Sequence, residues 1–260
     1  MRGTFDNMEM IPFADRYEPV QALAYSNEHP QQVLYLRRPK GKVNTPLVLF
    51  FHGGGMTQGL RECPDCLYRG EYAVIEARYR LADVAKAPAQ AEDAAKAIAY
   101  CLTNAEMMGI DRSKVFVGGM SAGAYLAAIT VMAPRFLAQY GFSHNDIAGL
   151  ILLSGQMTTH FRFKADMGDT RGQFAPDYGE YAPMAHLSKD LPPMLLVTGE
   201  PGLDILARPE ENAFVAATLK ALEHPFVRCI SLKGHNHGMV LDGGNELICQ
   251  FMKAVLQGKQ

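Results

Sequence analysis

A serine flanked by two glycines stands where an apolar run gives way to a helix-forming segment. The run Val115–Val117 leads into Gly119-Met120-Ser121-Ala122-Gly123, and small and apolar residues follow. A sharp strand-to-helix turn brings backbones close together, so it favours glycine at both flanks and lifts the central hydroxyl clear of the sheet. The hydroxyl then lies at a helix N-terminus, where partial positive charge favours an oxyanion. The pattern predicts that Ser121 is a nucleophile.

A second glycine-rich segment lies about seventy residues upstream, where His52-Gly53-Gly54-Gly55 follows the apolar run Leu47–Phe51. Glycines in this position aim backbone N–H groups at a developing oxyanion. We therefore expect an oxyanion hole made by the N–H groups of Gly54, Gly55 and Ala122. His52 is expected to hold the loop and not to transfer protons, because it stands at the strand end beside these glycines.

Two histidines near the C-terminus are candidates for the base that a serine nucleophile needs. His235 and His237 come just after the apolar run Phe226–Ile230. A loop in this place, at the carboxyl edge of a parallel sheet, can carry a base to the nucleophile. We favour His237, because Gly238 lets its backbone approach closely, and we keep His235 as the alternative.

The acid that orients the base is expected on the loop after the run Met194–Val197. Asp204 occupies the loop proper, whereas Glu210 and Glu211 fall in the first turn of the next helix, where acids stabilise the helix dipole. Glu200, at the strand end, is the alternative to Asp204. The predicted triad is Ser121, Asp204 and His237.

The elements that must position these residues follow an alternating pattern. Short continuous apolar runs are typical of strands buried on both faces of a parallel sheet. They are Leu47–Phe51, Ala73–Ile75, Val115–Val117, Ile147–Leu153, Met194–Val197 and Phe226–Ile230. Helical spacing is clearest over Ala87–Met107, with Glu92, Asp93 and Lys96 expected to face solvent, and further helices are expected at Ala122–Met132, Pro209–Leu222 and Glu246–Val255. The order predicts an α/β fold with a doubly wound, mainly parallel sheet.

Two segments depart from this alternation. Val20–Tyr25 and Gln32–Leu36 are predicted to form an antiparallel pair before the parallel strands. Residues 157–189 have no sustained period, and we expect a short insertion over the site. Its Met and aromatic side chains are expected either to cover the site or to anchor the loop; they include Met157, Phe161, Phe163, Tyr178 and Tyr181.

The chain has five cysteines, a small and odd number, so a disulfide framework is not expected to hold the fold. This favours a reducing compartment. Cys63-Pro64-Asp65-Cys66 has the spacing of a redox pair. It is expected in the first helix after the glycine loop, without a second Cys or His pair to complete a zinc site. We regard redox or metal chemistry there as the lesser alternative.

Length and composition limit the number of domains and the kinds of partner that the protein can have. With 260 residues, 48% of them apolar, we expect a single packed domain over residues 1–260. A net charge of −2 without basic clusters argues against nucleic acid as a partner. No apolar run is long enough to span a bilayer, and the first ten residues lack a signal region, so we expect a cytoplasmic chain, with an exported mature form as the alternative.

Several of these segments together resemble a known family. They are the His52–Gly55 run, Tyr79-Arg80-Leu81, Pro88–Asp93, Gly119–Ala127 and Arg208–Asn212, and similarity extends from about Val20 to Val255. The chain resembles the α/β-hydrolase esterases and, within them, the bifunctional acetyl and feruloyl carbohydrate esterases. The resemblance supports Asp204 before Arg208-Pro209 and His237 before Gly238. Pro201-Gly202-Leu203 departs from the family pattern, because it places Asp204 five residues after Gly199 instead of three.

The prediction is a serine hydrolase of carboxylic esters that works through an acyl-enzyme and needs neither a metal nor an organic cofactor. The short insertion and the resemblance indicate small-molecule or oligosaccharide esters with acetyl or feruloyl groups. Arylformamide or peptide cleavage by the same triad, general short-chain ester hydrolysis, and a non-catalytic binding role stay as alternatives. The sequence leaves the oligomeric state open.

Overall fold

The computed structural model describes residues 13–59 and 63–258. The first ten residues, on which the expectation about a signal segment rests, lie outside the described part. The described part contains an eight-stranded sheet in the order β1-β2-β4-β3-β5-β6-β7-β8. The strands are β1 (Gln21–Ala24), β2 (Val33–Arg37), β3 (Thr45–Phe51), β4 (Ala73–Ala77), β5 (Ile110–Met120), β6 (Gly149–Leu153), β7 (Met194–Gly199) and β8 (Val227–Leu232).

The sheet combines both kinds of strand pairing. β1 pairs antiparallel with β2, and β2 antiparallel with β4, whereas all pairs from β4 to β8 are parallel. The α-helices are α1 (Ala89–Thr103), α2 (Ala122–Met132), α3 (Pro134–Ala138), α4 (Phe161–Asp166), α5 (Arg208–Ala221), α6 (Val240–Gly243) and α7 (Asn245–Leu256). The α/β-hydrolase fold expected from the sequence is confirmed.

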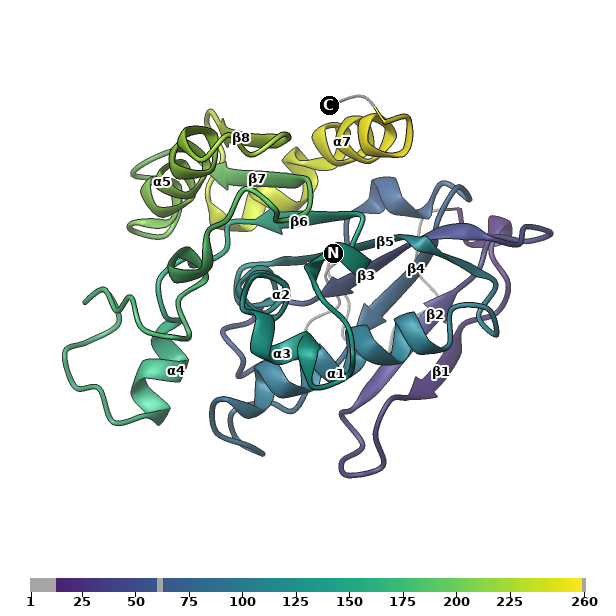
Figure 1. The fold of residues 1–260 in the computed structure, drawn as a ribbon, viewed down its shortest axis with the longest axis horizontal. Helices are drawn as coiled ribbons and strands as arrows, with labels where there is room; N and C mark the ends of the chain where they lie inside the picture. The colour runs from purple at the N-terminus through teal and green to yellow at the C-terminus, as the bar shows by residue number, and fades with distance from the viewer. Residues whose placement is uncertain (1–12, 60–62, 259–260) are drawn as a thin grey trace.

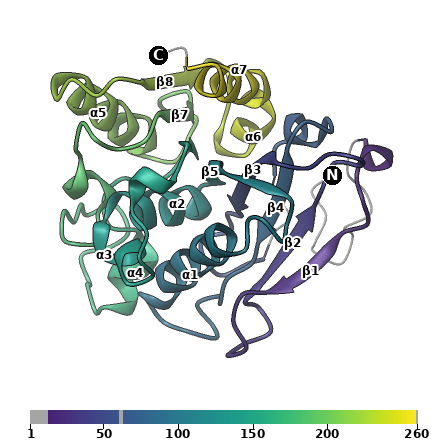
Figure 2. The same cartoon turned by 45° about the vertical axis from the view of Figure 1, so that its right-hand side comes forward.

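Alternate residues of the central strands build two separate cores. Leu47, Leu49 and Phe51 of β3 pack in the core that also contains residues of α1, α2 and α5. Val48 and Phe50 belong to the core on the opposite face, with α7 and the 3-10 turn η3 (Asp65–Tyr68). Figures 1 and 2 show α1 and α2 together on one side of the sheet and α7 beyond the other. Burial on both faces explains why these strands read as continuous apolar runs.

The register brings the carboxyl ends of the parallel strands to one edge. Phe51 pairs with Gly119, Leu153 with Val197, and Gly199 with Leu232. The loops that leave β3, β5, β6, β7 and β8 therefore emerge side by side. Functional side chains on these loops can meet although they lie far apart in the sequence.

Helix α1 departs from the sequence analysis at one residue. Asp93, expected to face solvent, is buried and pairs with Arg80 at 2.7 Å between Oδ1 and Nη2. Gln32 Nε2 of the loop before β2 donates to the same Oδ1 at 2.7 Å. Helical spacing assigned Asp93 to the polar face, but the chain after β4 and the loop before β2 cover that face.

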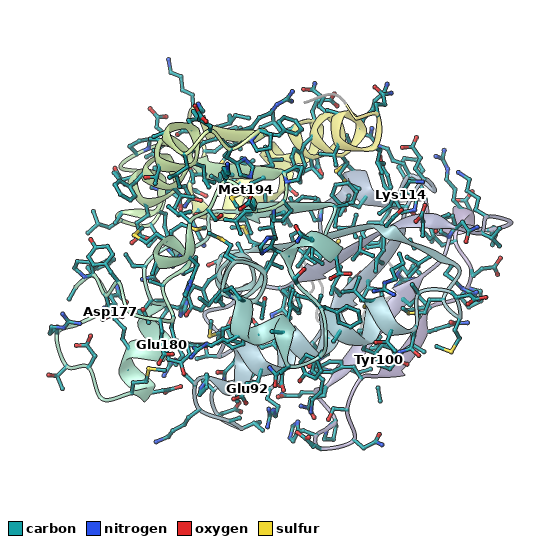
Figure 3. All side chains as sticks on the ribbon, viewed as in Figure 1. Glu92, Tyr100, Lys114, Asp177, Glu180 and Met194 are labelled. Atoms are coloured by element: carbon teal, nitrogen blue, oxygen red, sulfur yellow. The ribbon has the colours of Figure 1, made fainter. Side chains whose placement is uncertain are left out.

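The insertion has more structure than its sequence suggested. It contains α4 and the 3-10 turn η5 (Pro183–His186), and Lys164 donates from α4 to Gly172 O at 2.9 Å. In Figure 1, α4 and the loop after it extend outward from the body of the molecule, and Figure 3 shows Asp177 and Glu180 on this projecting segment. The insertion therefore stands beside the sheet edge and does not form a layer across it.

Candidate active site

Ser121 lies at the turn between β5 and α2 with a strained backbone, at φ 55° and ψ −115°. A non-glycine residue with positive φ is uncommon, and such strain is concentrated at functional sites. The Ser121 N–H donates to Leu153 O at 2.8 Å, which ties the turn to the end of β6. The structure thus holds Ser121 in the elbow conformation expected from the sequence.

The flanking glycines allow three backbone segments to touch. A Cβ on Gly119 would lie 2.3 Å from the carbonyl carbon of Gly123, and a Cβ on Gly123 would lie 2.0 Å from Phe51 O. Both distances are far too short for a side chain. The elbow therefore packs directly on the end of β3, and the loop His52–Gly55 begins at that point.

The loop after β3 turns back through two glycines in the left-handed region, Gly54 at φ 88° and Gly55 at φ 61°. The N–H groups of Thr57 and Gln58 donate to Gly54 O at 3.0 and 3.2 Å, which closes a tight turn. Among the hydrogen bonds of the described residues, none uses the N–H of Gly54, Gly55 or Ala122 as a donor. These three groups are thus available to an oxyanion.

His52 is packed into the loop. Its ring stacks on Tyr79 with centroids 4.4 Å apart, and its Nδ1 lies 2.8 Å from Gly53 O. The Tyr79 hydroxyl also donates to His52 O at 2.9 Å. Burial lowers the pKa of the His52 imidazole to about 4, so the ring is neutral at physiological pH. These contacts agree with a role in holding the loop.

Asp204 and His237 form a direct pair: His237 Nδ1 lies 2.7 Å from Asp204 Oδ1. Asp204 also accepts hydrogen bonds from the N–H groups of Gly199 and Ile205, both at 2.7 Å. Burial acts to raise the pKa of the Asp204 carboxyl, but the hydrogen bonds from His237, Ser154 and these N–H groups outweigh it and leave that pKa below its usual value. Asp204 is therefore an ionised acceptor that fixes the Nδ1–H form of His237.

The alternatives to this pair have other partners. Glu200 Oε2 accepts from Gly234 N at 2.6 Å, and Glu200 N donates to His235 O at 2.9 Å. The ring of His235 lies against Gly243, where a Cβ would be 2.6 Å from His235 Cδ2. Glu200 and His235 thus anchor the loop that carries His237, while His237 alone of the two histidines contacts Asp204.

Ser154 is a site residue that the sequence analysis missed. It follows β6, has a positive φ of 47°, and places Oγ 2.7 Å from Asp204 Oδ2 and 3.0 Å from His237 Nδ1. The signal was present: a hydroxyl residue directly follows the apolar run Ile147–Leu153, at the edge where the other site residues gather. Only the strand order shows that this run lies next to the strand before Asp204.

Contacts through β6 bring the nucleophile and the pair together. Ser121 N donates to Leu153 O, and the next residue, Ser154, contacts both Asp204 and His237. No hydrogen bond between Ser121 Oγ and His237 Nε2 is present in the described part of the chain. Hydrogen bonds of this kind are often long until a substrate is bound.

A cavity of about 400 Å³ adjoins this edge, between the insertion and the start of α5. Phe161 lines it and also approaches the glycine loop, because a Cβ on Gly55 would lie 3.6 Å from Phe161 Cζ. Ile205, next to Asp204, and Arg208, which donates to Ser154 O at 3.2 Å, line the other side. None of Ser121, Asp204 and His237 lines the cavity, but two of its lining residues contact the site: Ile205 N donates to Asp204 Oδ1, and Arg208 donates to Ser154 O.

The aromatic residues of the insertion divide between two roles. Phe161 faces the cavity, as does Phe174, which the sequence analysis did not single out. Phe163 is fully buried and packs edge-on against Tyr125 and Tyr181. Tyr178 is exposed. Some of these side chains thus line the cavity and others anchor the segment, which are the two roles considered from the sequence.

The Cys63-x-x-Cys66 segment lies apart from this edge. Of the two cysteines only Cys66 falls within η3, a single 3-10 turn instead of the expected helix, and its carbonyl oxygen accepts from Cys249 Sγ of α7 at 3.9 Å. Within residues 13–59 and 63–258, no group of three or more His, Cys, Asp or Glu side chains is arranged to hold a metal ion. No helix in the same part of the chain has the length and apolar character needed to cross a membrane.

Comparison with known proteins agrees with this geometry. Residues 34–145 match the family BD-FAE. The carboxylic ester hydrolase LipN of Mycobacterium tuberculosis is 38% identical over 109 residues, 40% of this chain and 29% of that protein. An arylesterase of Saccharolobus solfataricus is 37% identical over 102 residues, 37% of this chain and 33% of that protein. A truncated carbohydrate esterase from gut microbiota has a solved structure with a TM-score of 0.77 at 17% identity, covering 95% of this chain and 99% of that one.

The sheet topology defines the class of fold, which is the α/β-hydrolase fold. Over residues 34–145 the chain is similar to the BD-FAE family, which agrees with the resemblance drawn from the sequence motifs. The matched regions span about a third of the length of the curated relatives. The activity and substrates of the whole protein are therefore matters of proposal.

Proposed function

We propose that this protein is a serine hydrolase of carboxylic esters, with Ser121, His237 and Asp204 as its catalytic triad. The observation that carries the proposal is the meeting of a strained serine elbow with an Asp–His pair at one sheet edge. Relatives named as a carboxylic ester hydrolase and an arylesterase support the reaction class.

The geometry supports a two-step reaction through an acyl-enzyme. Because Asp204 holds the proton of His237 on Nδ1, Nε2 can accept the Ser121 proton as Oγ attacks the ester carbonyl. The N–H groups of Gly54, Gly55 and Ala122 then stabilise the oxyanion. His237 returns the proton to the leaving alcohol, and water, activated in the same way, releases the acid from Ser121.

For the substrate, we propose short acyl or feruloyl esters carried on carbohydrates. The cavity beside the triad offers two aromatic rings, Phe161 and Phe174, and polar groups from Gln156, Thr158 and Arg208. Such a lining suits an aromatic or small acyl group next to a hydroxylated alcohol. The likeness to a structure named as a carbohydrate esterase supports this class, although at 17% identity it establishes the fold alone.

The reaction class is tested by Ser121→Ala. Loss of the nucleophile should reduce kcat for p-nitrophenyl acetate on the order of 10³-fold or more while the far-UV circular dichroism stays unchanged. A fluorophosphonate probe should label the wild type and not this variant. Ser113→Ala, at an exposed serine of β5, is the matched control and should keep full activity and labelling. Normal turnover by Ser121→Ala would contradict the assignment of Ser121 as the nucleophile.

The substrate class is tested by a panel of acetylated xylo-oligosaccharides, methyl ferulate, an N-formyl arylamine, a chromogenic peptide and simple alkyl acetates. Acetylated sugars or ferulate should show the highest kcat/KM. A preference for the formamide or the peptide would assign the triad to those reactions. Equal activity on all short esters would make the protein a general carboxylesterase.

A further inference from the structure

A second cavity, of about 460 Å³, lies between α7 and the chain that follows η3. Both elements pack on the face of the sheet opposite α1 and α2. The cavity is lined by Cys249 and Lys253 of α7 and by Arg69 and Tyr72 of the facing segment, among others. Its lining residues belong to α7 and to the segment after η3, and none of them contacts Ser121, Asp204 or His237, so the cavity belongs to a different part of the molecule.

Cys249 meets a second thiol at the edge of this cavity. Cys66 of η3 is buried, whereas Cys249 is partly exposed. The Cys249 thiol donates to Cys66 O, with Sγ 3.9 Å from the oxygen. Asn245, one helical turn before Cys249, accepts the Cys66 N–H at 3.1 Å with its Oδ1. η3 and α7 are thus fixed against each other, with the two cysteines side by side.

The surroundings make the two thiols unequal. The hydrogen bond from Cys66 lowers the pKa of the Cys249 thiol to about 7 and the Arg69 guanidinium acts in the same direction, against burial and the carboxylates of Glu246 and Glu71. The same hydrogen bond, together with burial, raises the pKa of Cys66. Near neutral pH, Cys249 is therefore the accessible sulfur with thiolate character, and Cys66 is the protonated sulfur behind it.

We propose that Cys249 and Cys66 form a thiol oxidation site whose co-reactant is a small hydroperoxide entering this cavity. The Cys249 sulfur attacks the O–O bond of hydrogen peroxide, gains one oxygen as a sulfenic acid and releases water. The Cys66 thiol attacks that sulfur, forms the disulfide and releases a second water. The two thiols lose two electrons and two protons, and the peroxide is reduced to two molecules of water.

The product joins two elements that lie far apart in the chain. Cys66 and Cys249 are separated by 183 residues, so the disulfide closes a long loop of the unfolded chain. Long loops lose the most conformational entropy when they are closed. Oxidation should therefore stabilise the fold and raise Tm by about 5 °C or more.

The test treats the reduced full-length protein with a small excess of hydrogen peroxide, blocks remaining thiols and maps peptides without reduction. The expected result is a cross-linked peptide containing Cys66 and Cys249, about 2 Da lighter than its two reduced parts together because two hydrogens are removed. Dithiothreitol should separate the two parts again. A peptide joining Cys63 to Cys66, or Cys249 oxidised without a cross-link, would overturn the proposal.

Variants separate the two steps. In Cys66→Ser, Cys249 should be trapped by dimedone as a sulfenic acid, and Cys249→Ser should form no cross-link. Cys229→Ser is the matched control, because Cys229 is also partly exposed but burial raises its pKa; it should oxidise like the wild type. In the reduced wild type, iodoacetamide at pH 7 should alkylate Cys249 about tenfold faster than Cys229. Equal rates would contradict the assignment, and none of these measurements depends on ester hydrolysis.

Discussion

The carboxylates of Asp204 and Glu200 lie on one loop and yet accept hydrogen bonds from different partners. Asp204 bonds the His237 ring, Ser154 and two N–H groups, whereas Glu200 bonds the N–H of Gly234. The charge that faces the imidazole is therefore that of Asp204. Both residues carry a carboxylate, and they differ in their hydrogen-bond partners.

Replacing these acids one at a time should rank them. Asp204→Asn removes the charge that stabilises the imidazolium and should lower kcat on the order of 10³-fold, whereas Glu200→Gln should retain most of the activity. Steady-state hydrolysis of p-nitrophenyl acetate measures both, with circular dichroism as the control for folding. The reverse ranking would assign the role of triad acid to Glu200.

The buried imidazole of His52 should make stability depend on pH. Its pKa is about 4 in the folded protein, below the value of 6.5 for a solvated ring, so the unfolded chain binds the proton first as the pH falls. Stability from this residue is complete above pH 6.5 and decreases toward pH 4, by about 3 kcal/mol over the whole interval. Urea unfolding of the wild type and of His52→Gln at pH 7 and pH 5 measures the effect. The variant should show the smaller loss between the two pH values, and an equal loss would contradict the prediction.

The part of the site that lies in short sequence motifs could be predicted from the sequence. Ser121 and the glycine loop are encoded by short continuous motifs, because each depends on local backbone geometry. The choice between Asp204 and Glu200, and the presence of Ser154, depend on which loops meet at the sheet edge. The match to BD-FAE ends at residue 145, before Asp204 and His237, so those two positions rest on spacing and on the structure.

At the scale of elements, the elbow between β5 and α2 depends on contact with the end of β3. Gly123→Ala would place a Cβ 2.0 Å from Phe51 O, within a packed core where neither backbone can move freely. We expect a loss of activity on the order of 10³-fold and a lower Tm, because the turn that holds Ser121 must shift. Activity and thermal unfolding measure the two effects.

Gly168→Ala is the matched control for this change. Gly168 has a positive φ of 85°, but a Cβ there would meet nothing within 4 Å. Only backbone strain of about 1 kcal/mol should result, with activity unchanged. If both variants behaved alike, close packing of the elbow would not be the cause of the loss.

The elements themselves were predicted well where the chain is buried on both sides. The six apolar runs all became strands, although β5 extends back to Ile110 through exposed polar residues that carry no strand signal. The predictions were weakest where tertiary contacts override local pattern. Asp93 was assigned to a polar face that Arg80 and Gln32 cover, and the irregular insertion contains α4 and η5.

For the molecule as a whole, the insertion projects from the body (Figure 1), and we expect it to leave room for only a short acyl group in the cavity beside the sheet edge. Long acyl chains would extend past the cavity into water, where each added methylene gains little of the roughly 0.8 kcal/mol available on burial. We expect kcat/KM for p-nitrophenyl esters to fall steeply beyond about four acyl carbons. A series from acetate to dodecanoate measures it, with Ser121→Ala correcting for spontaneous hydrolysis. A maximum among the long chains would show that the insertion closes over the substrate.

The strand order also divides the proposed triad along the chain. Ser121 and the glycine loop are held by β3 and β5, whereas Asp204 and His237 follow β7 and β8. Domains are synthesised from the N-terminus, so the ribosome delivers the nucleophile long before the base. A nascent chain that ends before His237 lacks the base of the proposed triad. Under the proposed mechanism, ester hydrolysis therefore begins only after β7 and β8 have joined the sheet.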